Sequence, residues 1–213
     1  MSGLVNYIID LETLGLSSKY HEVCEVSIIR CSDRVQLTEF IKVEYPERAN
    51  YDALKVCNKT MADLEYGKPR NEVITQIDKF LNEDGLTPAH RCMVAHNSPF
   101  DLRFTHAMYE SSGKVFPGNL WLCTMALTKA YAKKIGLVKP KVNLGASLDI
   151  CEIKKFAGAH ASKVDSRNTY LLWKDLVENK QVDYLSHIKS IPHNYDLPIQ
   201  DNNDGLDLSL LDD

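Results

Sequence analysis

The spacing of hydrophobic and polar positions along the chain predicts a set of strands near its beginning. Residues 4–9 form a short apolar run rich in Val, Ile and Tyr, which is typical of a buried strand. Residues 23–30 and 35–44 have the same character, and the polar residues 32–34 between them predict a turn. Three strands joined by short turns indicate an antiparallel meander.

From about residue 72 the apolar positions change to helical spacing, and helices then alternate with strands. The predicted elements are, in chain order, a helix from about 72 to Gly85, a strand at 91–95, a helix from 100 to Gly113, a strand at 120–123, helices near 124–134 and 147–156, and a last long helix around 169–176. Strands first, and strand–helix alternation afterwards, predict an α/β fold. We expect a mixed five-stranded sheet, with an antiparallel meander and parallel strands, flanked by helices.

The pattern also divides the chain into two parts. Residues 1–190 have the length and apolar content of one compact domain with a buried core. Beyond Ile191 the composition changes to Pro, Asn and Asp, and residues 196–213 contain six Asp and neither Lys nor Arg. We therefore predict that residues 191–213 form an acidic, flexible tail.

The composition of the chain excludes some classes of protein and argues against others. A content of 44% hydrophobic residues excludes disorder of the whole chain. The net charge of −4 argues against a generic basic nucleic-acid binder, but residues 1–195 alone carry +2. A secretory signal or a membrane-spanning stretch is not evident, and the six cysteines are scattered without a C-x-x-C pair. These features predict reduced thiols in a cytoplasmic, reducing location.

A first candidate cluster of chemistry follows the first predicted strand. Strand side chains alternate, so Asp10 and Glu12 project from one face and are close enough to hold one cation together. Adjacent carboxylates repel one another unless they are protonated or neutralised, and a hard divalent ion is the usual remedy. The alternative is a polar strand end that runs into a turn at Gly15.

A second cluster lies where the strand at 91–95 gives way to a helix. Ser98 is a good N-cap residue, Pro99 suits the first helical position, and Asp101 follows three residues after the cap. Asp101 could therefore be the acidic member of a capping box rather than a functional carboxylate.

The third cluster, His160 and Asp165, opens the last long helix. Five residues correspond to about 140° of rotation on a helix, so the two side chains would not share a helical face. They can meet at one point if His160 lies on the preceding loop and Asp165 in the first turn. A lone His is also commonly a surface or structural residue.

The order of these clusters resembles the DnaQ-like 3′–5′ exonucleases of the DEDDh type, in the RNase H-like superfamily. Three segments carry the resemblance, within about residues 4–180: Asp10-Leu-Glu12-Thr13-x-Gly15-Leu16, then His96-Asn97-x-x-Phe100-Asp101, then His160-x4-Asp165. The family includes the proofreading epsilon subunit of DNA polymerase III, RNase T and oligoribonuclease. The resemblance implies an RNase H-like fold and a hydrolase that removes nucleotides from 3′ ends.

The resemblance also implies roles for individual residues. Asp10, Glu12, Asp101 and Asp165 would hold two Mg²⁺ or Mn²⁺ ions in one active site, with Asp10 bridging them. His160 would be the general base, because its ordinary pKa of about 6.5 suits that task. In relatives the residues after the first carboxylate sense the terminal 3′-hydroxyl. The substrate-binding residues expected on this basis are Leu11, Thr13, Leu14 and Asn97.

The chain departs from the family pattern in three places. Residues 55–60 stand where many relatives carry a His-Gly pair, Leu14 replaces a common Thr and could act as an apolar wedge, and Ser162 stands where Ala is common. We expect that none of these departures touches a metal ligand or the base.

Partners are less specified by the sequence. The resemblance implies single-stranded DNA or RNA 3′ ends as substrate, with DNA favoured; RNA trimming or degradation of short oligoribonucleotides is the alternative. Five lysines between 129 and 141 would form a basic loop that steers the strand, or else a solvated surface loop. Residues 205–211 are similar to peptides that dock on a sliding clamp, so the chain could be a clamp- or polymerase-associated module. Some relatives are dimers, and a homodimer is therefore a further possibility.

Overall fold

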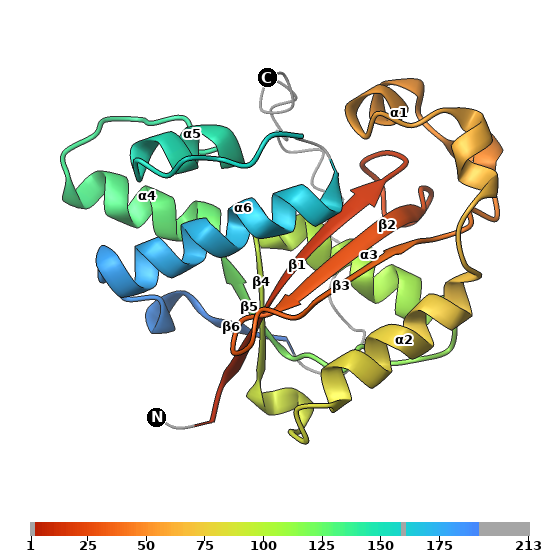
Figure 1. Ribbon diagram of the computed structural model, residues 1–213, viewed down its shortest axis with the longest axis horizontal. Helices are drawn as coiled ribbons and strands as arrows, with labels where there is room; N and C mark the ends of the chain where they lie inside the picture. The colour runs from red at the N-terminus through yellow and green to blue at the C-terminus, as the bar shows by residue number, and fades with distance from the viewer. Residues whose placement is uncertain (1–2, 159–160, 192–213) are drawn as a thin grey trace.

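The computed structural model describes residues 3–158 and 161–191 (Figure 1). The proposed general base His160 and the predicted tail from residue 192 onward, with its clamp-like segment 205–211, lie outside the described residues. Within the described part of the chain, no helix combines the length and the apolar character needed to cross a membrane. All six cysteines are free thiols, as the sequence predicts.

One mixed sheet of six strands forms the centre of the fold, in the order β3-β2-β1-β4-β5-β6. Its strands are β1 (Val5–Thr13), β2 (Val23–Arg30), β3 (Gln36–Phe40), β4 (Arg91–Ala95), β5 (Leu120–Cys123) and β6 (Lys189–Ser190). The first three are the predicted antiparallel meander, and β1, β4 and β5 run parallel. The mixed α/β sheet is therefore confirmed, but the expected count of five strands is wrong.

The sixth strand was not predicted because it is short and polar. β6 has only two residues, and both side chains are exposed, so it lacks the apolar alternation by which strands are recognised. It pairs antiparallel with β5. The next residue, Ile191, donates its backbone N–H to the carbonyl oxygen of Asn119 at 2.8 Å and packs against the core.

Helices cover both faces of the sheet: α4, α5 and α6 lie on one side, and α2 and α3 on the other (Figure 1). The helices of the described residues are α1 (Tyr51–Val56), α2 (Arg70–Asn82), α3 (Ser98–Glu110), α4 (Thr124–Lys134), α5 (Leu144–Ile150) and α6 (Ser162–Lys174), and α6 continues as a π-helical turn, η4 (Asp175–Asn179). The helix predicted at 147–156 begins and ends earlier. Asn143 caps it by accepting the backbone N–H of Ala146 at 2.8 Å.

Alternation along β1 divides its side chains between the two layers. Tyr7, Ile9 and Leu11 pack into the core beneath α2 and α3, whereas Ile8 packs beneath α4, α5 and α6. Asp10 and Glu12 follow Ile8 at a spacing of two and therefore face the same side as α6. β1 runs on to Thr13, so both carboxylates lie within the strand and not after it as the sequence suggests.

A buried ionic network closes the end of the sheet where β4 begins. Arg91 is 1% exposed, and its guanidinium donates to both carboxylate oxygens of Asp84, at 2.8 and 2.6 Å. The Tyr7 hydroxyl donates to the same carboxylate at 2.9 Å. Further guanidinium hydrogen bonds reach the carbonyl oxygens of Pro117 and Leu86. This network joins β1, β4 and the segments that flank them.

Candidate active site

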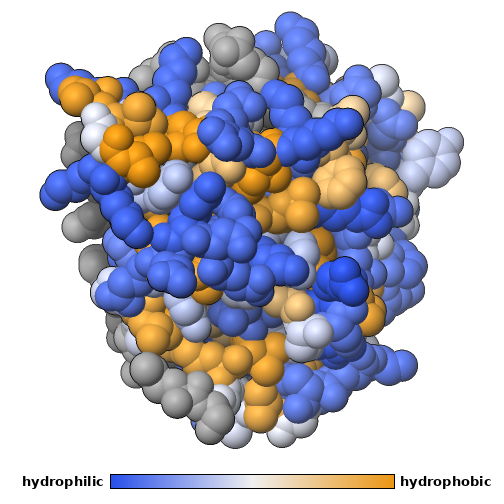
Figure 2. All heavy atoms as spheres, turned by 60° about the vertical axis from the view of Figure 1, so that its left-hand side comes forward, coloured by the Kyte–Doolittle hydropathy of each residue, from blue (hydrophilic) through white to orange (hydrophobic). Residues whose placement is uncertain are grey.

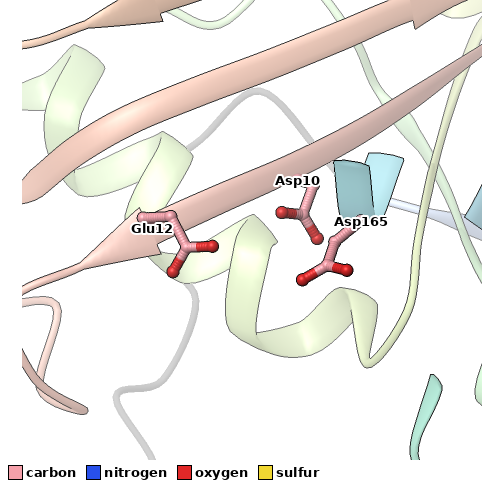
Figure 3. A group of neighbouring side chains, drawn as sticks. All are labelled: Asp10, Glu12 and Asp165. Carbon is pink, nitrogen blue, oxygen red and sulfur yellow. The ribbon is translucent and has the colours of Figure 1, made fainter. Parts of the chain in front are cut away.

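Strand β1 extends beyond its parallel neighbour, and this overhang carries the first two carboxylates. β1 pairs with β4 from Val5 to Ile8, whereas its pairing with β2 continues to Thr13. Beyond Ile8 one edge of β1 is therefore free to meet residues that follow β4. Asp10 and Glu12 lie in this overhang and project from the same face of the sheet (Figure 3).

Helix α6 brings the third carboxylate to the same point. Oxygen atoms of Asp10, Glu12 and Asp165 all lie within 4.8 Å of one another. Figure 3 shows the three carboxylates grouped beside β1, with Asp165 reaching them from the helix that covers this face. Asp165, from the third predicted cluster, therefore lies beside the first cluster although more than 150 residues separate them.

Polar contacts dock the beginning of α6 on β2 and β3. The Ser166 hydroxyl is 2.9 Å from the Ser27 hydroxyl of β2, and both residues are fully buried. The side-chain amide of Gln36 donates to the carbonyl oxygen of Lys163 at 3.0 Å and to Ser166 at 3.1 Å. Asp165 lies between these anchored positions, so its location relative to β1 is fixed by the sheet.

Asp101, in α3, also reaches the β1 overhang, and its local role differs from the capping box. Asn97 is the N-cap of α3, in the left-handed conformation (φ 67°), and Ser98 is the first helical residue. The Asp101 side chain is 4% exposed and accepts hydrogen bonds from its own backbone N–H and from that of Leu11 in the β1 overhang. The interpretation of Ser98 as N-cap is therefore wrong, and Asp101 lies beside the three grouped carboxylates.

Burial and mutual repulsion disfavour the charged forms of these groups when no cation is present. Burial, followed by the charges of Glu12 and Asp101, raises the pKa of Asp10 well above its ordinary value. Burial, contact with the Cys57 thiol and the charge of Asp165 raise the pKa of Glu12 to about 10. Burial also raises the pKa of Asp101, against the two backbone N–H groups that lower it.

These pKa shifts and the donor set fit a divalent metal. Carboxylate oxygens are the ligands that Mg²⁺ and Mn²⁺ prefer, and a cation removes the repulsion that raises the pKa values. Asp10, Glu12 and Asp165 are placed to share one ion. Asp101 is outside that group but near enough for its charge to act on Asp10.

Comparison with known proteins places the chain in a family. The RNase T family, described as an exonuclease family, matches residues 7–173. The chain belongs to this exonuclease family. The resemblance to DnaQ-like exonucleases of the RNase H-like superfamily, inferred from the three motifs, is thereby confirmed. The matched RNase T region contains the β1 overhang and α6 as far as Trp173.

Curated relatives of this RNase T domain include much longer proteins. DNA polymerase III PolC-type of Staphylococcus saprophyticus is 24% identical over 130 residues, which is 61% of this chain and 9% of that protein. The corresponding protein of Staphylococcus haemolyticus is 23% identical over 182 residues, 84% of this chain and 12% of that protein. The chain thus corresponds to about a tenth of the length of these relatives.

Solved structures share the fold of the RNase T domain at low sequence identity. E. coli Exonuclease I in complex with a dT13 oligonucleotide superposes with a TM-score of 0.69 at 16% identity, over 84% of this chain and 42% of the other. The nuclease domain of 3′hExo, a DEDDh family member bound to rAMP, superposes with a TM-score of 0.65 at 14% identity, over 85% and 96%. These similarities establish the same architecture.

The residues predicted to bind substrate occupy different environments. Leu11 and Thr13 are each 7% exposed, and the Thr13 hydroxyl donates to the carbonyl oxygen of Gly15 at 2.8 Å. Asn97 is half-buried at the start of α3. Leu14 is 1% exposed and packs in a small core cluster with Val43, so its side chain is not the expected apolar wedge. Contacts of these residues with a 3′ end remain predictions.

One departure from the family pattern does reach a proposed metal ligand, contrary to expectation. The Cys57 thiol is in hydrogen-bond contact with the Glu12 carboxylate, and it donates to the carbonyl oxygen of Thr13 at 3.6 Å. The short helix α1 ends at Val56 and so presents Cys57 to the β1 overhang. Sequence spacing alone does not reveal a contact between segments 45 residues apart.

Glu25 is a further acidic residue at the site, and it lies outside the three sequence motifs. It lies in β2 directly opposite Glu12, is 3% exposed, and its charge contributes to the raised pKa values of Asp10 and Glu12. A carboxylate in an otherwise buried strand requires polar partners, because an unpaired buried charge is costly. Its position between Cys24 and Val26 was the available signal in the sequence.

The electrostatics predict how stability depends on pH and metal. Carboxyl pKa values that are higher in the folded state than the ordinary values near 4 make folding less favourable as pH rises above about 4. Without metal, the melting temperature should therefore fall between pH 5 and pH 8 more than in the Asp10→Asn variant. Mn²⁺ should raise the wild-type melting temperature by about 3 °C or more at pH 8.

Differential scanning fluorimetry in chelator and in Mn²⁺, from pH 5 to pH 9, measures both effects. The Asp10→Asn variant is the control and should lose most of the shift caused by Mn²⁺. An equal Mn²⁺ shift in both proteins would contradict the assignment of Asp10 as a ligand.

Proposed function

We propose that this chain is a metal-dependent 3′–5′ exonuclease that acts on single-stranded nucleic acid, with DNA favoured, and releases nucleoside 5′-monophosphates. The observation that carries the proposal is the group of Asp10, Glu12 and Asp165, whose oxygens lie within 4.8 Å of one another at the end of β1. Membership of the RNase T exonuclease family supports the reaction class.

The four acidic residues have distinct proposed tasks. Asp10, Glu12 and Asp165 would hold one Mg²⁺ or Mn²⁺ ion, while Asp101 would serve a second with Asp10. Bound together, two such ions make water a better nucleophile and offset the charge that develops on the phosphate and the leaving oxygen. The β1 overhang and the docked start of α6 keep these carboxylates in register with one another.

His160 is the proposed general base. It precedes α6 and would accept the proton of the attacking water on a ring nitrogen. The oxygen of that water bonds to the terminal phosphorus, the bond from phosphorus to the neighbouring 3′-oxygen breaks, and that oxygen leaves with a proton. The products are a nucleoside 5′-monophosphate and a strand with a new 3′-hydroxyl.

The lysine-rich segment from the end of α4 to the start of α5 supports binding of a polyanion. The first three of its five lysines lie in α4, so the expected basic loop is partly helical; all five are exposed: Lys129, Lys133, Lys134, Lys139 and Lys141. This segment lies at the left of Figure 1, on the side that comes forward in Figure 2, where hydrophilic surface is interspersed with apolar patches. We propose that these lysines attract the phosphates of the strand, an effect that salt should weaken.

A preference for DNA is supported by the curated relatives, which are named as DNA polymerases. The second candidate is a 3′–5′ exoribonuclease, favoured by the likeness of the fold to 3′hExo, described as bound to rAMP. A gel assay in Mg²⁺ with matched DNA and RNA oligonucleotides, single- and double-stranded and labelled at either end, tests the proposal. Shortening of 5′-labelled single strands in one-nucleotide steps is expected, and internal cleavage would contradict it.

Association with a polymerase or a sliding clamp, and a homodimer, remain proposals. The matched region in the PolC-type relatives supports a link to replication. Six free thiols support an intracellular, reducing location.

Replacement of His160 by glutamine should lower kcat by about 10²–10⁴-fold, the usual contribution of a general base. In the wild type, kcat/KM should rise with pH through the histidine titration near 6.5, because the unprotonated ring is the active form. That rise should disappear in His160→Gln. Rates at several pH values, with calorimetry to verify that Mn²⁺ still binds, make the test. A variant that retains the same pH dependence would exclude His160 as the base.

A further inference from the structure

The buried carboxylate of Glu25 connects three elements around the active site. Glu25 lies opposite Glu12 in the β1–β2 register, so the two side chains share the face of the sheet that α6 covers. Its position is 3% exposed. None of the proposed catalytic roles uses this residue, although it is more buried than the proposed metal-binding carboxylates.

Both carboxylate oxygens of Glu25 have a partner from a different part of the chain. One oxygen accepts a hydrogen bond of 2.7 Å from the hydroxyl of Ser162, the first residue of α6. The other forms a 2.7 Å ion pair with the ammonium group of Lys59, whose side chain is 14% exposed. Lys59 also lies over the ring of Phe40 in β3, 4.9 Å from its centre. The Lys59–Glu25–Ser162 link therefore joins the segment after α1 to β2 and α6.

Charge balance explains why an additional carboxylate can be accommodated here. Asp10, Glu12, Asp101 and Asp165 together match the charge of two divalent cations. Lys59 neutralises Glu25, so this fifth carboxylate adds no net charge to the group. A buried ion pair with such close hydrogen bonds specifies an arrangement more than it adds stability.

The position of Ser162 makes this link relevant to the metal site. Ser162 precedes Asp165 by three residues on the same helix, which places both on adjacent positions of one helical face. Lys59 and Ser162 each belong to one of the segments where the chain departs from its family's pattern. Two departures far apart in the sequence thus converge on one carboxylate.

We propose that Glu25 is a positioning residue of the active site: with its charge balanced by Lys59, it holds the first turn of α6 where Asp165 can share a metal ion with Asp10 and Glu12. This inference rests on the proposed metal-dependent function. Residues that orient metal ligands through hydrogen bonds typically change metal affinity by 10–100-fold when they are replaced.

Replacement of Ser162 by alanine tests the link with minimal loss of volume. The Kd for Mn²⁺, measured by isothermal titration calorimetry on the full-length protein, should increase by about tenfold or more. At a fixed, limiting Mn²⁺ concentration kcat should fall, whereas KM for a single-stranded oligonucleotide should not change. Glu25→Gln should have the same effect and provides a second, independent variant.

Ser147→Ala is the matched control, because Ser147 is also a fully buried helical serine, in α5, whose hydroxyl donates to the carbonyl oxygen of Val142 and not to Glu25. It should retain wild-type Mn²⁺ affinity even if its melting temperature falls. Equal losses of Mn²⁺ affinity in Ser162→Ala and Ser147→Ala, or unchanged affinity in Ser162→Ala, would overturn the inference. Wild-type protein that binds no Mn²⁺ would overturn the proposed function and this inference together.

Discussion

Replacement of Asp10 by asparagine should reduce exonuclease activity by about a thousandfold or more. Asp10 belongs to the group with Glu12 and Asp165, and the charge of Asp101 also acts on it. Its loss removes a ligand from both proposed metal positions, and electrostatic stabilisation of the transition state accounts for several kcal/mol in sites of this kind. Initial rates on a 5′-labelled single strand in Mg²⁺ or Mn²⁺ give the measurement.

The variant Asp149→Asn is the control for this substitution. Asp149 is an exposed aspartate in α5, on the same side of the sheet. This variant should degrade the oligonucleotide at the wild-type rate. Because Asp10→Asn relieves repulsion among buried carboxylates, it should remain folded, as circular dichroism can verify. A folded Asp10→Asn protein that is as active as wild type would refute the assignment of the active site.

Replacement of Arg91 by methionine should destabilise the fold by about 3–5 kcal/mol, because it leaves the buried carboxylate of Asp84 without its cation. For a protein of this size the melting temperature should fall by about 10 °C or more. The Asp84 side chain is 5% exposed, so water cannot replace the guanidinium effectively. Chemical denaturation gives the free energy of unfolding, and calorimetry gives the melting temperature.

The same network predicts sensitivity to acid. Burial alone would raise the pKa of Asp84, but hydrogen bonds from Arg91, from the backbone N–H of Leu86 and from Tyr7 lower it to about 2. A lowered carboxyl pKa contributes stability that is complete above about pH 4 and is lost as pH falls toward 2. The wild-type melting temperature should fall steeply over that interval, and the fall should be smaller in Arg91→Met.

Removal of both charges separates the cost of an unpaired carboxylate from the value of the pair. The double variant Asp84→Leu/Arg91→Met should recover much of the stability lost in Arg91→Met, because apolar replacement of a buried ion pair is often nearly neutral. A double variant that is less stable than Arg91→Met would show that the network contributes mainly through its further hydrogen bonds to Pro117, Leu86 and Tyr7.

Helices and strands whose apolar residues recur with a clear period were predictable from the sequence. Element boundaries that depend on backbone pairing or on capping were not. β4 at residues 91–95 and α4 at 124–134 have the predicted bounds, since apolar spacing marks both. β1 runs four residues beyond its apolar segment, because pairing with β2 does not depend on which side chains follow. The region from η1 (Pro46–Arg48) to η2 (Met61–Glu65) consists of short turns with little periodicity, and it received no prediction.

The candidate site was predictable where residues share a strand or a motif. The alternation of β1 places Asp10 and Glu12 together without knowledge of the rest of the fold. That Asp165 joins them could be predicted only from the order of motifs shared with the family, because local spacing does not show that α6 crosses β1. The contacts among Glu25, Lys59 and Cys57 could not be predicted, because their segments come together only when the chain folds back beside β2. The one sign of them in the sequence is a charged residue, Glu25, in a largely apolar strand.

The alternation of side chains along β1 constrains the length of this strand and not only the identity of its residues. Inserting or deleting one residue between Val5 and Ile9 would exchange the two faces of the strand, turning the carboxylates toward the apolar layer beneath α2 and α3. Ile9 and Leu11 would then occupy the place of the metal ligands. In evolution this strand can accept changes of side chain but not of length, whereas the exposed segment between α4 and α5 can lengthen freely. Alignments of homologues should therefore show gaps at residues 135–141 and none within β1.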